Sequence, residues 1–145
     1  SSDLLEAYDV ELSGAHVVIV GRGLTIGRPL ANLMALKHGP NAAVTVVHTG
    51  VADIGAYTRV ADVIVAAAGA PAMITADMVK PGAAVVAAGV SFRDGKVLSD
   101  VTDDVAEVAG YLSPRIGGVG PMTRAMLLSN TVDAAEASVL RSSAR

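Results

Sequence analysis

A glycine-rich segment in the first quarter of the chain carries the clearest chemistry. Gly21, Gly23 and Gly27 directly follow the apolar run at residues 16–20, with Arg22 between the first two. In dinucleotide-binding proteins such glycines allow a sharp turn, leave room for a pyrophosphate and let the next helix pack closely. The N–H groups that begin this helix then face the anion. The spacing is one residue longer than the usual G-x-G-x-x-G, so a turn without a ligand is the alternative. The position between strand and helix favours a dinucleotide site.

The residues after the second apolar run indicate the type of cofactor. Domains that prefer NAD place an Asp or Glu there to bind the ribose 2′-hydroxyl. This chain has His48, Thr49 and Gly50, none of them acidic. Arg22 can donate to a 2′-phosphate, which an acid would repel. The sequence therefore predicts NADP; the alternative for Arg22 is a solvated loop charge.

A second glycine cluster at residues 117–120 precedes another predicted helix. It could contact a phosphate, a nicotinamide or a carboxylate, or it could be a loop that only needs positive φ. The acidic residues Asp100, Asp103 and Asp104 are interpreted as helix capping rather than as a catalytic pair, with Thr102 as the N-cap. The three histidines have no metal-binding spacing, and no G-x-S-x-G motif is present, so we predict neither a metal site nor a hydrolase triad.

The composition excludes several classes of protein. Eleven Lys and Arg against 14 Asp and Glu give a net charge of −3, which argues against nucleic-acid binding. The apolar stretch at 60–79 is interrupted by acids, glycine and proline, so we expect no membrane span. The first residues lack the basic region and apolar core of a signal peptide. The chain has no cysteine, which fits a reducing compartment, and we expect a cytoplasmic protein.

Apolar runs without alternation recur along the chain and end at small residues. They are typical of strands in a parallel sheet that is covered on both faces. The predicted strands are residues 16–20, 43–47, 62–67, 83–88 and 111–113, with a hairpin at 91–101 marked by its Asp-Gly turn signal. The predicted helices are residues 3–10, 29–37, 53–59, 75–79, 103–109 and 121–139. The alternation predicts an α/β fold, a Rossmann-type doubly wound, mostly parallel sheet in a single domain.

The glycine loop and several later segments carry a family likeness. Residues 18–30, Val-Ile-Val-Gly-Arg-Gly-Leu-Thr-Ile-Gly-Arg-Pro-Leu, resemble the cofactor loop of the methylenetetrahydrofolate dehydrogenase/cyclohydrolase (FolD) family. Further matches follow in order at residues 44–49, 61–69 and 79–83. The segments 117–123, Gly-Gly-Val-Gly-Pro-Met-Thr, and 126–132 are the most specific. The likeness covers residues 4–137, nearly the whole chain.

The resemblance implies a role in one-carbon folate metabolism. Enzymes of this family transfer a hydride from methylenetetrahydrofolate to NADP and then hydrolyse the methenyl product to 10-formyltetrahydrofolate. Carried onto this chain, Gly21, Arg22 and Gly23 would line the cofactor phosphates. Thr49 would lie beside the 2′-phosphate, and Val90 would touch the nicotinamide side. The family often forms homodimers through this domain, and residues 92–98 are a candidate contact.

The same resemblance implies a missing partner. The family's folate pocket and catalytic Tyr-x-x-x-Lys lie in an N-terminal domain, and this sequence contains no such motif. We therefore expect residues 1–12 to be a remnant of the interdomain helix, residues 13–140 to be the NADP-binding domain and residues 141–145 to be a frayed tail. We expect this chain by itself to have no catalytic activity. An apolar stripe on the last helix, including Met122, Met126 and Val132, is expected to meet the absent domain in part.

Three positions depart from the family pattern. Ala87 replaces an aspartate, Ser99 a glycine and Ile116 a proline. Two alternatives stand beside the family interpretation, and the departures at Ala87 and Ile116 motivate the second of them. One is a shikimate-dehydrogenase-like NADP domain, and the other is a stand-alone nucleotide-binding or assembly module without chemistry.

Overall fold

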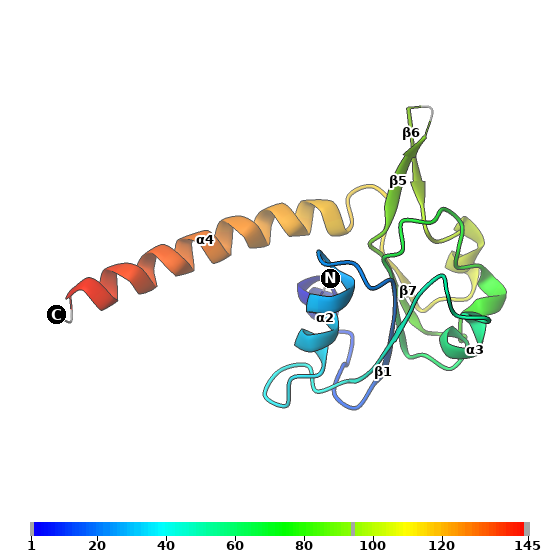
Figure 1. The fold of residues 1–145 in the computed structure, drawn as a ribbon, viewed down its shortest axis with the longest axis horizontal. Coiled ribbons are helices and arrows are strands. Elements are labelled where there is room, and N and C mark those ends of the chain that lie inside the picture. Colours follow the sequence, from blue (N-terminus) through cyan, green and yellow to red (C-terminus); the bar gives the residue numbers. More distant parts are fainter. Residues whose placement is uncertain (1, 94, 144–145) are drawn as a thin grey trace.

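A five-stranded parallel sheet forms the centre of the protein (Figure 1). The computed structural model describes residues 2–93 and 95–143. The sheet has the order β2-β1-β3-β4-β7 and every neighbouring pair is parallel. Its strands are β1 (His16–Val20), β2 (Ala43–Val47), β3 (Val63–Ala66), β4 (Ala84–Ala87) and β7 (Tyr111–Leu112). The chain runs from β1 outward to β2 and then returns to β3 on the other side of β1, as predicted for a doubly wound sheet.

Small aliphatic side chains fill the two layers on either side of this sheet. Val18 and Val20 belong to one buried cluster, and Val17 and Ile19 belong to the other, because successive side chains of a strand point to opposite faces. Helices α1 (Ser2–Ala7) and α2 (Gly27–Met34) supply buried residues to the second cluster. The segments around α3 (Gly55–Thr58), η1 (Ala76–Met78) and η2 (Asp103–Glu107) cover the opposite face. Burial on both faces explains why the strands lack polar alternation.

The helices differ from the prediction more than the strands do. Helix α2 begins two residues earlier than expected and ends at Met34. The segments predicted as helices at 75–79 and 103–109 are the short 3₁₀ helices η1 and η2. Thr102 does not cap η2, because its hydroxyl donates to the carbonyl of Ile74 at 3.0 Å. Asp103 and Asp104 do lie in the first turn of η2, where the helix dipole favours acids.

Two elements project from the body. The predicted hairpin is confirmed as antiparallel β5 (Val90–Arg93) and β6 (Lys96–Ser99) (Figure 1). Helix α4 (Val119–Ser143) starts earlier and ends later than predicted, so residues 141–143 of the expected tail are helical, and residues 144 and 145 lie outside the described part. None of the described helices has the length and hydrophobicity needed to cross a membrane.

The apolar stripe predicted on α4 is not continuous. Met122 packs against a core cluster, whereas Val132 is 48% exposed. Ten residues of an α-helix turn through about 1,000°, which leaves these two side chains about 80° apart around the axis. Leu128, Val132 and Val139 instead share one exposed face of the projecting helix.

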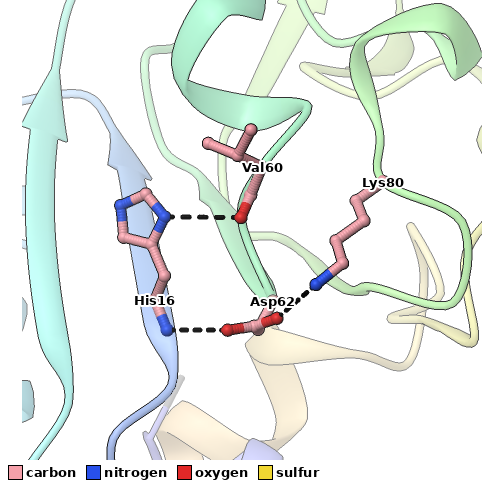
Figure 2. Close-up of polar contacts among 4 residues, drawn as sticks. All are labelled: His16, Val60, Asp62 and Lys80. Atoms are coloured by element: carbon pink, nitrogen blue, oxygen red, sulfur yellow. Dashed lines mark hydrogen bonds and ion pairs between the residues drawn. The ribbon is translucent and has the colours of Figure 1, made fainter.

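Polar contacts tie the strands together at the edge where the strands begin. Figure 2 shows the carboxylate of Asp62, just before β3, between two donors. The backbone N–H of His16 donates to it at 2.9 Å, and the ammonium of Lys80 donates at 2.7 Å. These contacts, with the hydrogen bond from Lys80 as the largest cause, lower the pKa of Asp62 below its ordinary value of 3.8.

Candidate functional site

A cleft of about 430 Å³ lies at the edge where β1, β2 and β3 end. Parallel strands present their carboxyl ends at one edge, and a ligand binds there where the strand order reverses. Here the reversal falls between β1 and β3, and the glycine loop directly follows β1. The cleft is lined by Gly21, Arg22, Gly23, Leu24, Arg28, His48, Thr49, Ala67 and Ala68.

Each of the three glycines in the loop is required for a different structural reason. Gly21 has φ of +128°, and a Cβ there would overlap the carbonyl of Ala67 at the end of β3. A Cβ on Gly27 would overlap the carbonyl of Gly21, so α2 can pack against the loop only without one. Gly23 has no atom within 4 Å of its Cβ position. The first and third glycines therefore shape the turn, and the second leaves open space beside the cleft.

The loop carries backbone N–H donors that the described part of the chain does not use. The N–H of Gly21 donates to Val47 at 2.8 Å, and that of Arg28 donates to Gly23 at 3.1 Å. Across residues 2–93 and 95–143, no acceptor is recorded for the N–H groups of residues 22–26. Unpaired N–H groups that precede a helix form a site for an anion, and phosphate is the anion that such loops bind.

Positive charge surrounds these donors. Arg22 and Arg28 line the cleft, and none of its lining residues is acidic. Both arginines are exposed and can turn toward a ligand. His48 is held in place, because its ring Nδ1 accepts the N–H of Gly50 at 3.1 Å, which leaves Nε2 to carry a proton. The cleft thus suits a ligand with several phosphate groups.

The structure brings four of the five predicted site residues together. Gly21, Arg22, Gly23 and Thr49 all line the cleft. Val90 does not; it begins β5, after the end of β4, and is 44% exposed. Sequence reasoning missed the lining role of Arg28, although its place one residue after the third glycine was a usable signal.

The second glycine cluster is explained by its backbone. Gly117 has φ of +86°, and a Cβ on Gly118 would overlap the carbonyl of Pro114. This favours the interpretation as a loop that needs glycine, one of the two left open by the sequence. Among the described residues, no group of three or more His, Asp or Glu is placed to hold a metal ion.

A larger hollow of about 600 Å³ has the opposite electrostatic character. Glu6, Asp9 and Glu11 line it, and no basic residue does. Its charge would repel phosphates, so size alone does not mark the ligand site.

Comparisons with known proteins agree with this geometry. The family described as "Tetrahydrofolate dehydrogenase/cyclohydrolase, NAD(P)-binding domain" matches residues 1–139. The bifunctional protein FolD of Syntrophotalea carbinolica is 55% identical over 134 residues, which are 92% of this chain and 46% of that protein. This chain therefore spans about half the length of that relative.

Solved structures show the same likeness. The bifunctional FolD of Campylobacter jejuni matches with a TM-score of 0.87 and 41% identity, covering 94% of this chain and 48% of that one. The enzyme of Trypanosoma brucei, solved with NADP and an inhibitor, matches with a TM-score of 0.85 and 40% identity over 94% of this chain and 48% of its own. The matches support the interpretation as a dinucleotide-binding domain of the tetrahydrofolate dehydrogenase/cyclohydrolase family. They give no support to a shikimate-dehydrogenase-like domain.

Proposed function

The chain belongs to the tetrahydrofolate dehydrogenase/cyclohydrolase family as its NAD(P)-binding domain, and we propose that it binds NADP for a methylenetetrahydrofolate dehydrogenase/cyclohydrolase. The observation that carries the proposal is the cleft itself. Residues 22–24, whose N–H groups have no recorded acceptor among the described residues, line the same cleft as Arg28. Bound NADP would supply the acceptor for a hydride.

Each part of the cleft has a role in this proposal. Gly23 leaves room for the pyrophosphate, because no protein atom lies within 4 Å of its Cβ position, and Gly21 allows the sharp turn that brings the loop to the cleft. Arg22 and Thr49, with Arg28 beside them, bind the 2′-phosphate through charge-assisted hydrogen bonds. The absence of an acid after β2 favours NADP over NAD. Val90 lies farther along the strand edge, on the nicotinamide side.

The complete reaction is proposed to need a second domain. We propose that residues 1–12 lead from an N-terminal folate-binding catalytic domain and that 13–140 form the cofactor domain. The exposed face of α4 with Leu128, Val132 and Val139 supports a partner there. A hollow of about 440 Å³ with a mostly apolar lining lies between α2 and the start of α4. A homodimer through the β5–β6 hairpin and a cytoplasmic location belong to the same proposal.

Calorimetric titration of the purified chain tests the cofactor. We expect saturable binding of NADP, and binding of NAD that is weaker by at least about tenfold, since the 2′-phosphate contributes charged hydrogen bonds. The absence of saturable NADP binding would refute the proposal.

The departures from the family pattern motivate one rival, a module that binds nucleotide without chemistry. Ala87 is buried in β4 and Ile116 is 80% exposed, and neither lines the cleft. Adding the N-terminal half of a relative to this chain and measuring methylenetetrahydrofolate-dependent NADPH formation separates the two. We expect activity from the mixture and none from either half alone; an inactive mixture that still binds NADP would favour the rival.

A further inference from the structure

Asp100 is a fully buried carboxylate that connects three separate loops. It lies directly after β6, and its exposed fraction is 0%. One oxygen, Oδ2, accepts the N–H of Ala68 at 2.8 Å and the N–H of Gly69 at 2.7 Å. Its own N–H donates to the carbonyl of Gly89 at 3.2 Å, and its carbonyl accepts the N–H of Ile74 at 2.9 Å. The expectation that Asp100 caps a helix is therefore wrong.

The surroundings of the carboxylate are adapted to its presence. A Cβ on Gly89, just after β4, would overlap Oδ2 of Asp100. The second oxygen, Oδ1, has no hydrogen-bond partner within the described residues. Burying a carboxylate is costly unless it is well paired, so a residue that serves only packing would not be an acid here. The paired oxygen points to a role at the segment it holds.

That segment is a wall of the cofactor cleft. Ala68 lines the cleft, and Gly69 is its neighbour with φ of +66°. Gly69 is held from a second side, because the hydroxyl of Ser91 donates to its carbonyl at 3.1 Å. Asp100 and Ser91, which both lie at the base of the β5–β6 hairpin, thus fix the turn after β3 through two separate hydrogen-bonded contacts.

The position of this turn assigns it to one half of the ligand. A dinucleotide lies across the point where strand order reverses, with one nucleotide on each side. His48 and Thr49 after β2 lie on the adenosine side, as the proposed 2′-phosphate site requires. The turn after β3 and Gly89 after β4 lie on the other side. The nicotinamide half therefore meets the loops that Asp100 holds.

We infer that Asp100 is a positioning residue for the nicotinamide half of NADP, acting through the turn at residues 68 and 69. The inference rests on the proposed function, since it assumes that NADP occupies the cleft. Asp100 does not touch the ligand. It sets the distance between the turn after β3 and the end of β4, and Gly89 gives its carboxylate the room to do so.

Two ligands separate this role from general destabilisation. NADP contains both halves, whereas adenosine 2′,5′-bisphosphate contains only the half on the β2 side. For Asp100→Ala we expect the Kd of NADP to rise roughly tenfold and that of the bisphosphate to change by less than about twofold. Asp100→Asn keeps the shape of the side chain and disturbs folding less than Asp100→Ala. For this variant we expect the Kd of NADP to rise about threefold and that of the bisphosphate to stay unchanged, because a neutral oxygen is a weaker acceptor.

A double-mutant cycle tests the link to Gly89. Gly89→Ala should raise the Kd of NADP about tenfold, because its methyl group displaces the carboxylate. In the Asp100→Ala background the same substitution should raise the Kd of NADP by less than about twofold, since the overlapping carboxylate is gone. Additive effects would show that Gly89 acts independently of Asp100.

Asp62→Ala is the matched control. It also removes a carboxylate that accepts a backbone N–H, at the opposite edge of the sheet (Figure 2). We expect it to leave both dissociation constants unchanged. Equal losses of NADP and bisphosphate affinity in the Asp100 variants, or no loss in either, would overturn the inference while the proposed function stands. Failure of the unsubstituted chain to bind either ligand would overturn both.

Discussion

Gly27 begins helix α2 in direct contact with the carbonyl of Gly21, with no space for a Cβ between them. This contact closes the glycine loop at residues 22–26 against the start of the helix. The extra residue in the glycine spacing is therefore accommodated inside the loop, and the two outer glycines still meet.

Substitutions of Gly27 and Gly23 should separate loop structure from ligand space. Gly27→Ala must push two backbone segments apart, so we expect it to lower the free energy of unfolding by about 1–3 kcal/mol and to weaken NADP binding. Gly23→Ala meets no protein atom within 4 Å, so we expect stability to change by less than about 0.5 kcal/mol. Its methyl group should still weaken NADP binding. Thermal unfolding and calorimetry check both, and a stable Gly23→Ala variant with full affinity would contradict the assigned ligand path.

The arginines of the cleft should determine the preference between NADP and NAD. Removing a charged hydrogen bond costs about 1.5–3 kcal/mol, so Arg22→Ala should raise the Kd of NADP roughly 10- to 100-fold while changing that of NAD much less. We expect a smaller shift in the same direction for Arg28→Ala. Arg124→Ala, an exposed arginine on α4, is the control. If Arg22→Ala weakens both cofactors equally, this arginine binds the pyrophosphate and not the 2′-phosphate.

Features that depend on residues close together in the sequence could be predicted, and features that depend on contacts between distant residues could not. β1 and β2 match their predicted bounds because each is a run of mostly β-branched residues, which favour strands, followed by a glycine-containing turn segment. The site of Gly21, Arg22 and Gly23 was visible for the same reason, as it is local to one loop. The role of Asp100 was not, because its partners Ala68 and Gly69 lie 32 and 31 residues away. The 3₁₀ type and the shorter bounds of η1 and η2 do not follow from the sequence, because packing, and not propensity, decides such short segments.

Acid should weaken the edge of the sheet that is remote from the cleft. The pKa of Asp62 is lowered in the folded protein, so its contacts stabilise the fold above the unfolded value near 3.8 and are lost as the pH falls through the lower folded value. Both Asp62 and Lys80 are nearly half exposed, which limits the effect to less than about 1 kcal/mol. Asp62→Asn should therefore be slightly less stable than the unsubstituted chain at pH 7. Urea unfolding should show this difference shrink as the pH falls below 3.8 and through the lower folded value. A stability difference that persists at low pH would show that it arises from packing and not from the charge of Asp62.

The β5–β6 hairpin should carry the contact between two copies of the chain. Phe92 is 78% exposed on this two-stranded ribbon, whose outer edges are unpaired among the described residues. An unprotected strand edge with an aromatic side chain is favourable for pairing with a second edge. We expect sedimentation to show a dimer whose dissociation constant rises at least about tenfold in Phe92→Asp, since a charge would be buried at the contact. Ile116→Asp, at a residue that is 80% exposed in another loop, should leave the dimer intact. Dimers that survive Phe92→Asp and dissociate in Leu128→Asp would place the contact on α4, and the hairpin would then be free of this role.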